Sequence, residues 1–172
     1  DIRLVKYFKE TNNNQKVWYV DATDKDNNDM VGGDILIDVR SSGLGTPPDK
    51  EAKFKKTSLI AEGSIIIKGT QKVTMQAHVE PSNNETFPNL ATENGNIYSN
   101  DTPINGGDGR QFNGLVYTQN GDIQFNCING VSLVGTNVKV YGEVNLEYEQ
   151  GEKYIDTNGF FGSISKLSWQ EK

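Results

Sequence analysis

The amino-acid sequence predicts a mainly β protein: an N-terminal β-hairpin region, then a small β-solenoid of the parallel β-helix kind, then a C-terminal cap. Three observations support this expectation. Its 18 glycines and 19 asparagines favour turns over helices. Apolar residues alternate in short runs, as in half-buried strands. Glycine also recurs every seven residues at positions 114, 121, 135 and 142, with Ile128 filling the remaining step.

Residues 1–60 are expected to form the hairpin region. The stretch 16–22, KVWYVDA, has the aromatic and β-branched content of a strand, and 34–40, DILIDVR, has β-branched residues at every second position. The turn-rich stretch 23–33 between them predicts that the two strands pair as a hairpin. The side chains of the second strand that are expected to point inward are those of Ile35, Ile37 and Val39.

Residues 61–152 are expected to form the solenoid. Strand character runs through 57–69 and 71–79, and shorter units follow at 115–117, 122–125, 131–134, 137–141 and 143–148. Strands this short gain few hydrogen bonds in a meander, whereas stacking each on its equivalent one coil away pairs it on both sides. Three sides of about seven residues predict a coil of about 21 residues. The side chains expected to point inward are Val116, Ile123, Phe125, Leu133, Val138, Val140, Val144 and Leu146.

Residues 153–172 are expected to act as a cap. They are rich in aromatic and aliphatic side chains, which predicts packing against the open solenoid end or back on the N-terminal region. A cap is needed because an open end exposes unpaired strand edges to aggregation.

Composition excludes several classes of function. The net charge of -6 disfavours nucleic acid as a partner, because the phosphate backbone repels an acidic chain. Cys127 is the single cysteine and His78 the single histidine, which rules out an intrachain disulfide and a Cys/His zinc site. Cys127 is expected to be a small buried residue, and His78 a structural or surface one. No run of ~20 apolar residues that could span a membrane is present.

Two segments resemble parts of a known family. Residues 17–45, VWYVDATDKDNNDMVGGDILIDVRSSGLG, resemble the hairpin after the N-terminal helix of minor pilin-like proteins of the type IV pilus. Residues 113–146, NGLVYTQNGDIQFNCINGVSLVGTNVKVYGEVNL, resemble the glycine-stepped β-solenoid of some pilus-assembly proteins.

The resemblance implies a non-enzymatic function. It implies the ectodomain of a minor pilin or pilus-associated protein, displayed on the cell surface. The Asn/Lys-rich sequence without a disulfide favours a Gram-positive source. Its partners would be other pilin subunits, and it would meet the membrane only through a hydrophobic N-terminal helix that this sequence lacks.

Residues 24–29, DKDNND, carry the oxygen ligands that calcium prefers: Asp24, Asp26, Asn28 and Asp29. The EF-hand pattern fails, since the sixth position is Asp29 and the twelfth is Ile35. A solvated acidic turn is therefore the favoured interpretation, and a calcium site is the alternative. No other cofactor is expected, because 106–110, GGDGR, lacks the lysine and strand–helix context of a phosphate loop.

Two further groups define alternative functions. Parallel β-helices offer outer faces where carboxylates can act on polysaccharides, and Asp101, Asp108, Arg110 and Asp122 are the candidates for such an enzyme. Tyrosines in the predicted strands are interpreted first as core or corner packing, but they could instead contact a partner or stack on a glycan or host-surface ligand, as in a phage or surface adhesin. These tyrosines are Tyr98, Tyr117, Tyr141 and Tyr148. The basic cluster of Lys50, Lys53, Lys55 and Lys56 is interpreted as a solvated loop.

Overall fold

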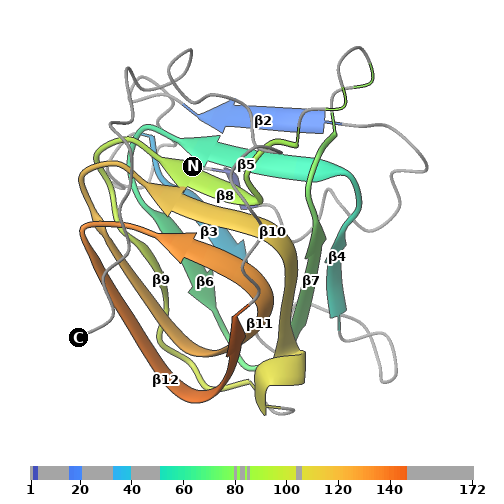
Figure 1. Ribbon diagram of the computed structural model, residues 1–172, viewed down its shortest axis with the longest axis vertical. Helices are drawn as coiled ribbons and strands as arrows, with labels where there is room; N and C mark the ends of the chain where they lie inside the picture. Colours follow the sequence, from blue (N-terminus) through green and yellow to red (C-terminus); the bar gives the residue numbers. More distant parts are fainter. Residues whose placement is uncertain are drawn as a thin grey trace.

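Figure 1 shows the protein as a computed structural model, which describes residues 2–3, 16–20, 33–39, 51–79, 81, 84, 86–103 and 106–146. The described residues are mainly β, as predicted; among them are no α-helix and one short 3₁₀ helix, η2 (Gly106–Gly109). The strands are β1 (Ile2–Arg3), β2 (Lys16–Val20), β3 (Ile35–Asp38), β4 (Glu51–Phe54), β5 (Thr57–Ala61), β6 (Ile65–Lys68), β7 (Lys72–Gln76), β8 (Leu90–Thr92), β9 (Ile97–Ser99), β10 (Arg110–Thr118), β11 (Asp122–Val134) and β12 (Asn137–Leu146).

All pairings between these strands are parallel, and they stack into three faces. The first face holds β2, β5, β8, the second half of β10 and the end of β11. The second holds β1, β3, β6, β9 and the first halves of β11 and β12. The third holds β4, β7, the start of β10, the middle of β11 and the end of β12.

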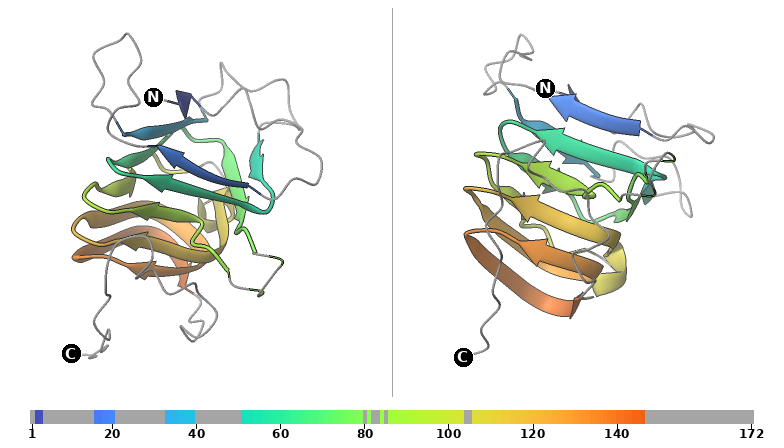
Figure 2. Two further views of the ribbon diagram at one scale, coloured as in Figure 1. Left: turned by 90° about the horizontal axis from the view of Figure 1, so that it is seen from above. Right: turned by 45° about the horizontal axis from the view of Figure 1, so that its top comes forward.

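The chain therefore follows a solenoid-like path that crosses the first, second and third faces in turn. Figures 1 and 2 show the coils stacked from β2 at one end to β12 at the other. The three bends of each coil are called here the first corner (first to second face), the second corner (second to third face) and the third corner (third to first face).

The hairpin predicted near the N-terminus is wrong. β2 pairs with β5, whereas β3 pairs with β1 and β6, so the two strands lie on different faces. Alternating apolar residues predict a strand and its buried side but do not identify its neighbour. The predicted boundary at residue 60 falls within β5, and the strands on both sides of it belong to one sheet.

The predicted coil length is also wrong. The register partner of Ile123 is Val138, whereas that of Ile35 is Ile65, so the first of these coils is shorter than predicted and the second is longer. The glycines do lie at corners: Gly114 at the third, Gly121 and Gly135 at the first, and Gly142 at the second. The sides between corners are unequal, so the seven-residue step is not one side of a regular coil.

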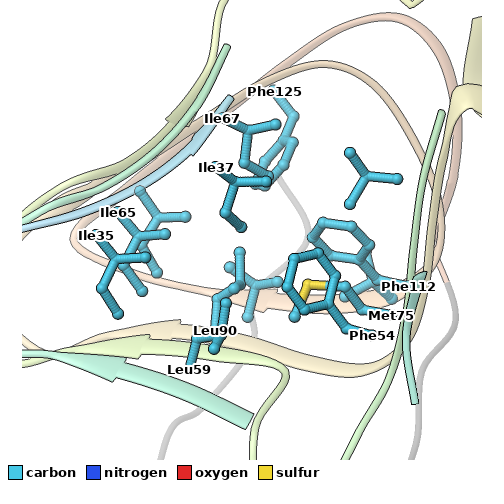
Figure 3. Packing of buried hydrophobic residues seen from close by; sticks show 14 of the residues in the cluster. Ile35, Ile37, Phe54, Leu59, Ile65, Ile67, Met75, Leu90, Phe112 and Phe125 are labelled. Carbon is cyan, nitrogen blue, oxygen red and sulfur yellow. The ribbon is translucent and has the colours of Figure 1, made fainter. Parts of the chain in front are cut away.

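The core fills the interior of the solenoid. Inward apolar side chains that are register partners in successive coils stack in columns. Figure 3 shows Ile35 beside Ile65 on one side and Leu59 beside Leu90 on another, all directed inward. The rings of Phe112 and Phe125 meet edge to face with centroids 5.9 Å apart. Among the predicted inward residues, Val116, Ile123 and Phe125 are buried, and Leu133 and Val140 pack against the core. Ile35, Ile37 and Val39 are also fully buried.

The first face carries a second apolar cluster on its outer side. Leu59, Leu90 and Val116 point into the main core, so their neighbours in the strands, Ile60, Ala91 and Tyr117, point outward because side chains alternate along a strand. These outward residues are nevertheless buried, together with Leu115, against Val17, Phe87 and Val134. The first face is thus apolar on both sides, as expected for a covered parallel sheet.

Candidate functional site

A sequence triplet recurs at the first corner of successive coils. Glycine, then Asp, Ser or Asn, then isoleucine occupy 33–35, 63–65, 95–97 and 121–123, and their isoleucines are register partners. The last coil has the related triplet Thr136–Asn137–Val138 at 136–138. This repeat is hard to find in the sequence because its spacing differs from one coil to the next. The signal that could have found it is the triplet itself, without a fixed period.

The middle residues of these triplets form a hydrogen-bonded ladder. The Ser64 amide donates to Oδ1 of Asp34 at 2.7 Å, and the Asn96 amide donates to Oγ of Ser64 at 3.1 Å. The Asp122 amide donates to Oδ1 of Asn96 at 2.8 Å, and Nδ2 of Asn137 donates to Oδ1 of Asp122 at 2.7 Å. Each coil thereby bonds a polar group of its neighbour, so the ladder favours the register in which these side chains meet.

The glycines of the same triplets allow the coils to stack closely. A Cβ atom at Gly95 would collide with the main-chain oxygen of Gly63, and one at Gly121 would collide with that of Gly95. The hydroxyl groups of Thr92 and Thr118 bond to the main chain of these glycines. Oγ1 of Thr118 donates to the oxygen of Gly95 at 2.9 Å and accepts from the Gly121 amide at 3.0 Å.

Arg110 is the most deeply buried charged side chain among the described residues, with no exposed surface. Its guanidinium donates to the main-chain oxygens of Gly69, Gln71 and Gly109 and to Oγ of Ser99. Burial lowers the pKa of Arg110 to about 10, and the nearby charge of Asp101 opposes this shift. The side chain of Arg110 therefore joins main-chain segments at the second corner.

The four candidates for polysaccharide chemistry do not meet in one groove. Asp101 lies near Arg110, and its Oδ2 accepts from the Gly69 amide at 2.6 Å. Asp108 lies in η2 and accepts from Nε2 of Gln111 at 3.2 Å. Asp122 belongs to the ladder at the first corner, away from the other three at the second. Each of these groups has a structural partner in the fold.

The tyrosines are placed on different faces rather than in one row. Tyr117 is only 5% exposed, and burial raises the pKa of its hydroxyl. Tyr98 is half-buried on the outer side of the second face, between Ile66 and Gln124 in register. Tyr141 is 52% exposed on the same face. Tyr148 lies outside the described residues.

Tyr141 is surrounded by polar side chains that define a candidate recognition face. The register sets Asn126 opposite Tyr141, and Gln124 opposite Lys139. The side-chain amides are held in place: Nε2 of Gln124 donates to Oδ1 of Asn100 at 2.8 Å, and Nδ2 of Asn126 donates to the Asn100 main-chain oxygen. We call Asn100, Gln124, Asn126, Lys139 and Tyr141 the amide–tyrosine face. Of these five residues, only Tyr141 was a candidate from the sequence.

The remaining candidates have structural or surface placements. Lys53, Lys55 and Lys56 are exposed, and Lys53 pairs with Glu51 at 2.9 Å. His78 is 6% exposed and packs its ring against Phe87. Cys127 is buried, as predicted, and occupies the second corner with a positive φ of 65°. Lys50 and the predicted calcium ligands Asp24, Asp26, Asn28 and Asp29 lie outside the described residues.

Within the part of the chain that the structure describes, no three His, Cys, Asp or Glu side chains gather as a metal site. The same residues include no helix that is long and apolar enough to cross a membrane. No protein-family profile, curated protein or solved structure matches the chain.

Proposed function

We propose that this protein is a non-catalytic subunit of a surface-displayed assembly of the pilus type, which acts by contacting neighbouring subunits. The observation that carries the proposal is the amide–tyrosine face. It presents Tyr141 at 52% exposure on a rigid parallel sheet, whereas the candidate catalytic groups are engaged within the fold. Exposed tyrosines on rigid surfaces are favoured as anchors in protein contacts, because they bury a large area at little cost in side-chain entropy.

The segment 113–146 supports the pilus-type assembly in this proposal. It resembles the glycine-stepped segments of pilus-assembly proteins, and its glycines lie at the corners of stacked coils. A scaffold of stacked coils gives a stiff, elongated surface along which subunits can pack.

The proposal is tested by photo-crosslinking in cells that produce the protein. A photoreactive phenylalanine analogue replaces Tyr141, and a control protein carries it at Lys53, which is exposed on the third face. We expect a crosslink to a pilin-type subunit from position 141 and none from position 53. Equal crosslinking from both positions, or none from position 141, contradicts the proposal. A leader followed by ~20 apolar residues, encoded upstream of Asp1, would support it independently.

The amide–tyrosine face also favours a second candidate, a glycan-binding adhesin module. An aromatic ring can stack on the C–H face of a sugar, and amides fixed by Asn100 leave their oxygens available to sugar hydroxyls. A glycan array probed with the protein and with Tyr141→Ala distinguishes the candidates. Binding that depends on Tyr141 favours the adhesin; a blank array together with a subunit crosslink favours the pilus subunit.

A further inference from the structure

The last coil leaves the end of the core uncovered by described residues. Val138, Val144 and Leu146 continue the columns of Ile123, Ile128 and Val131, which are fully buried. The last-coil residues are instead 40%, 37% and 49% exposed. Among the described strands, β12 pairs with β11 alone, so its other edge offers unpaired main-chain groups beside an apolar end of the core. Such an edge favours pairing with a further strand.

The sequence after Leu146 contains the signature of the first corner. Glycine followed by Asp, Ser or Asn and then isoleucine occurs five times in the chain. Four occurrences lie in the described part, and all four open a strand of the second face. The fifth is 162–164, Gly-Ser-Ile, the same triplet as 63–65. The spacing also fits, because Ile164 follows Val138 by as many positions as Ile123 follows Ile97.

We propose that the occupant of the β12 edge is this same chain: a strand opening at Ile164 pairs in parallel with β12. Ile164 then covers Val138 at the end of the isoleucine column, and Ser163 joins the ladder beside Asn137. The segment 147–172 is long enough for this coil, since the preceding coil runs only from Ile123 to Val138. Because the chain itself covers this edge, partner proteins would bind the outer sides of the three faces. The inference does not depend on the proposed function.

Engineered disulfides test the register directly, in a Cys127→Ser background. Register partners on adjacent strands have Cα atoms about 4.8 Å apart, within the range that a disulfide bridges, whereas an offset of two residues separates them by about 8 Å. The in-register pairs are Asn137→Cys with Ser163→Cys, and Lys139→Cys with Ser165→Cys. The matched controls exchange partners: Asn137→Cys with Ser165→Cys, and Lys139→Cys with Ser163→Cys.

We expect the two in-register pairs to oxidise within one chain and the exchanged pairs to stay reduced, as read by peptide mapping. Disulfides between chains would identify a second copy as the occupant and overturn the proposal. Equal oxidation of all four pairs, or of none, would also overturn it. If the cysteine variants do not fold, hydrogen exchange on the unmodified chain decides. Slow exchange of the β12 amides that do not bond to β11 supports the proposal, and fast exchange refutes it.

Discussion

Arg110 and Asp101 bind opposite ends of one residue, Gly69. The guanidinium donates to the Gly69 oxygen, and Oδ2 of Asp101 accepts from the Gly69 amide. By bonding to the main chain of Gly69, the two charged groups hold the second corners of adjacent coils together. Gly69 itself has a positive φ of 100°, so the corner that they hold is one that favours glycine.

Replacing Arg110 is therefore expected to destabilise the fold. Arg110→Met leaves the oxygens of Gly69, Gln71 and Gly109 without their donor in a buried site, and each such loss costs about 1–3 kcal/mol. We expect Arg110→Met to lower the free energy of unfolding by about 3–5 kcal/mol, which urea denaturation measures. Arg110→Lys should lose less, because it keeps one charged donor.

A matched surface change provides the control for Arg110. Lys53→Met removes a cation from an exposed pair with Glu51, so the change in stability should stay within about 1 kcal/mol. Equal effects of Arg110→Met and Lys53→Met would show that the second corner does not depend on the guanidinium.

The glycines of the first corner should tolerate no Cβ atom. Gly95→Ala and Gly121→Ala each place a methyl group against the main-chain oxygen of the preceding coil, which cannot move without separating the coils. We expect losses above about 3 kcal/mol, or failure to fold. Gly107→Ala is the control, because its new atom lies 3.3 Å or more from its neighbours. Thermal melts of the three variants measure the difference, and a similar melting temperature for all three would contradict close stacking.

The sequence was sufficient to predict the strands but not the path between them. Alternation in 34–40 correctly placed Ile35, Ile37 and Val39 in the core, because the period of a strand is a local property. The partner of that strand is β6, which begins only at Ile65; the triplets at 33–35 and 63–65 mark both strands, but their spacing is not repeated in the other coils. Loops of different length between the triplets removed any fixed period, so the glycine step near the C-terminus was mistaken for the length of a side.

The candidate site was predictable only in part, for a similar reason. Tyr141 could be singled out because an aromatic residue before a glycine is visible in the sequence. Its neighbours Asn100 and Asn126 are far apart in the sequence and meet only when the coils stack. Conversely, Arg110 was a candidate for polysaccharide chemistry, and only the fold shows that its guanidinium bonds to main-chain oxygens.

Thr118 should contribute to stability through its hydroxyl rather than its methyl group. Thr118→Val keeps the shape but removes the bonds to the Gly95 oxygen and from the Gly121 amide, in a side chain that is 1% exposed. We expect a loss of about 1–3 kcal/mol in urea denaturation. Thr136→Val is the control, since Thr136 is exposed at the same corner of the next coil. A loss no larger for Thr118→Val than for Thr136→Val would refute a structural role for the hydroxyl.

Glu51 should make stability depend on acid pH. Burial raises the pKa of its carboxyl, but the hydrogen bond from Thr74, the bond and charge of Lys53 and the charge of Lys72 outweigh it and hold the pKa below 4.5. A depressed carboxyl pKa contributes stability above the unfolded-state pKa, and this stability is lost as pH falls through the folded-state value. Glu51→Gln should therefore be less stable than the unmodified protein at pH 7, and the difference should shrink as pH falls and vanish once pH lies well below the folded-state pKa of Glu51.

Urea denaturation of both proteins across this range measures the difference for Glu51. Thr74→Val provides the control, because removing its hydroxyl brings the pKa of Glu51 nearer to its ordinary value and moves the loss of stability to higher pH. A difference between Glu51→Gln and the unmodified protein that stays constant as pH falls from 7 through the acid range would mean that the charge of Glu51 contributes nothing. The packing of its side chain beside Thr74 would then account for the whole effect.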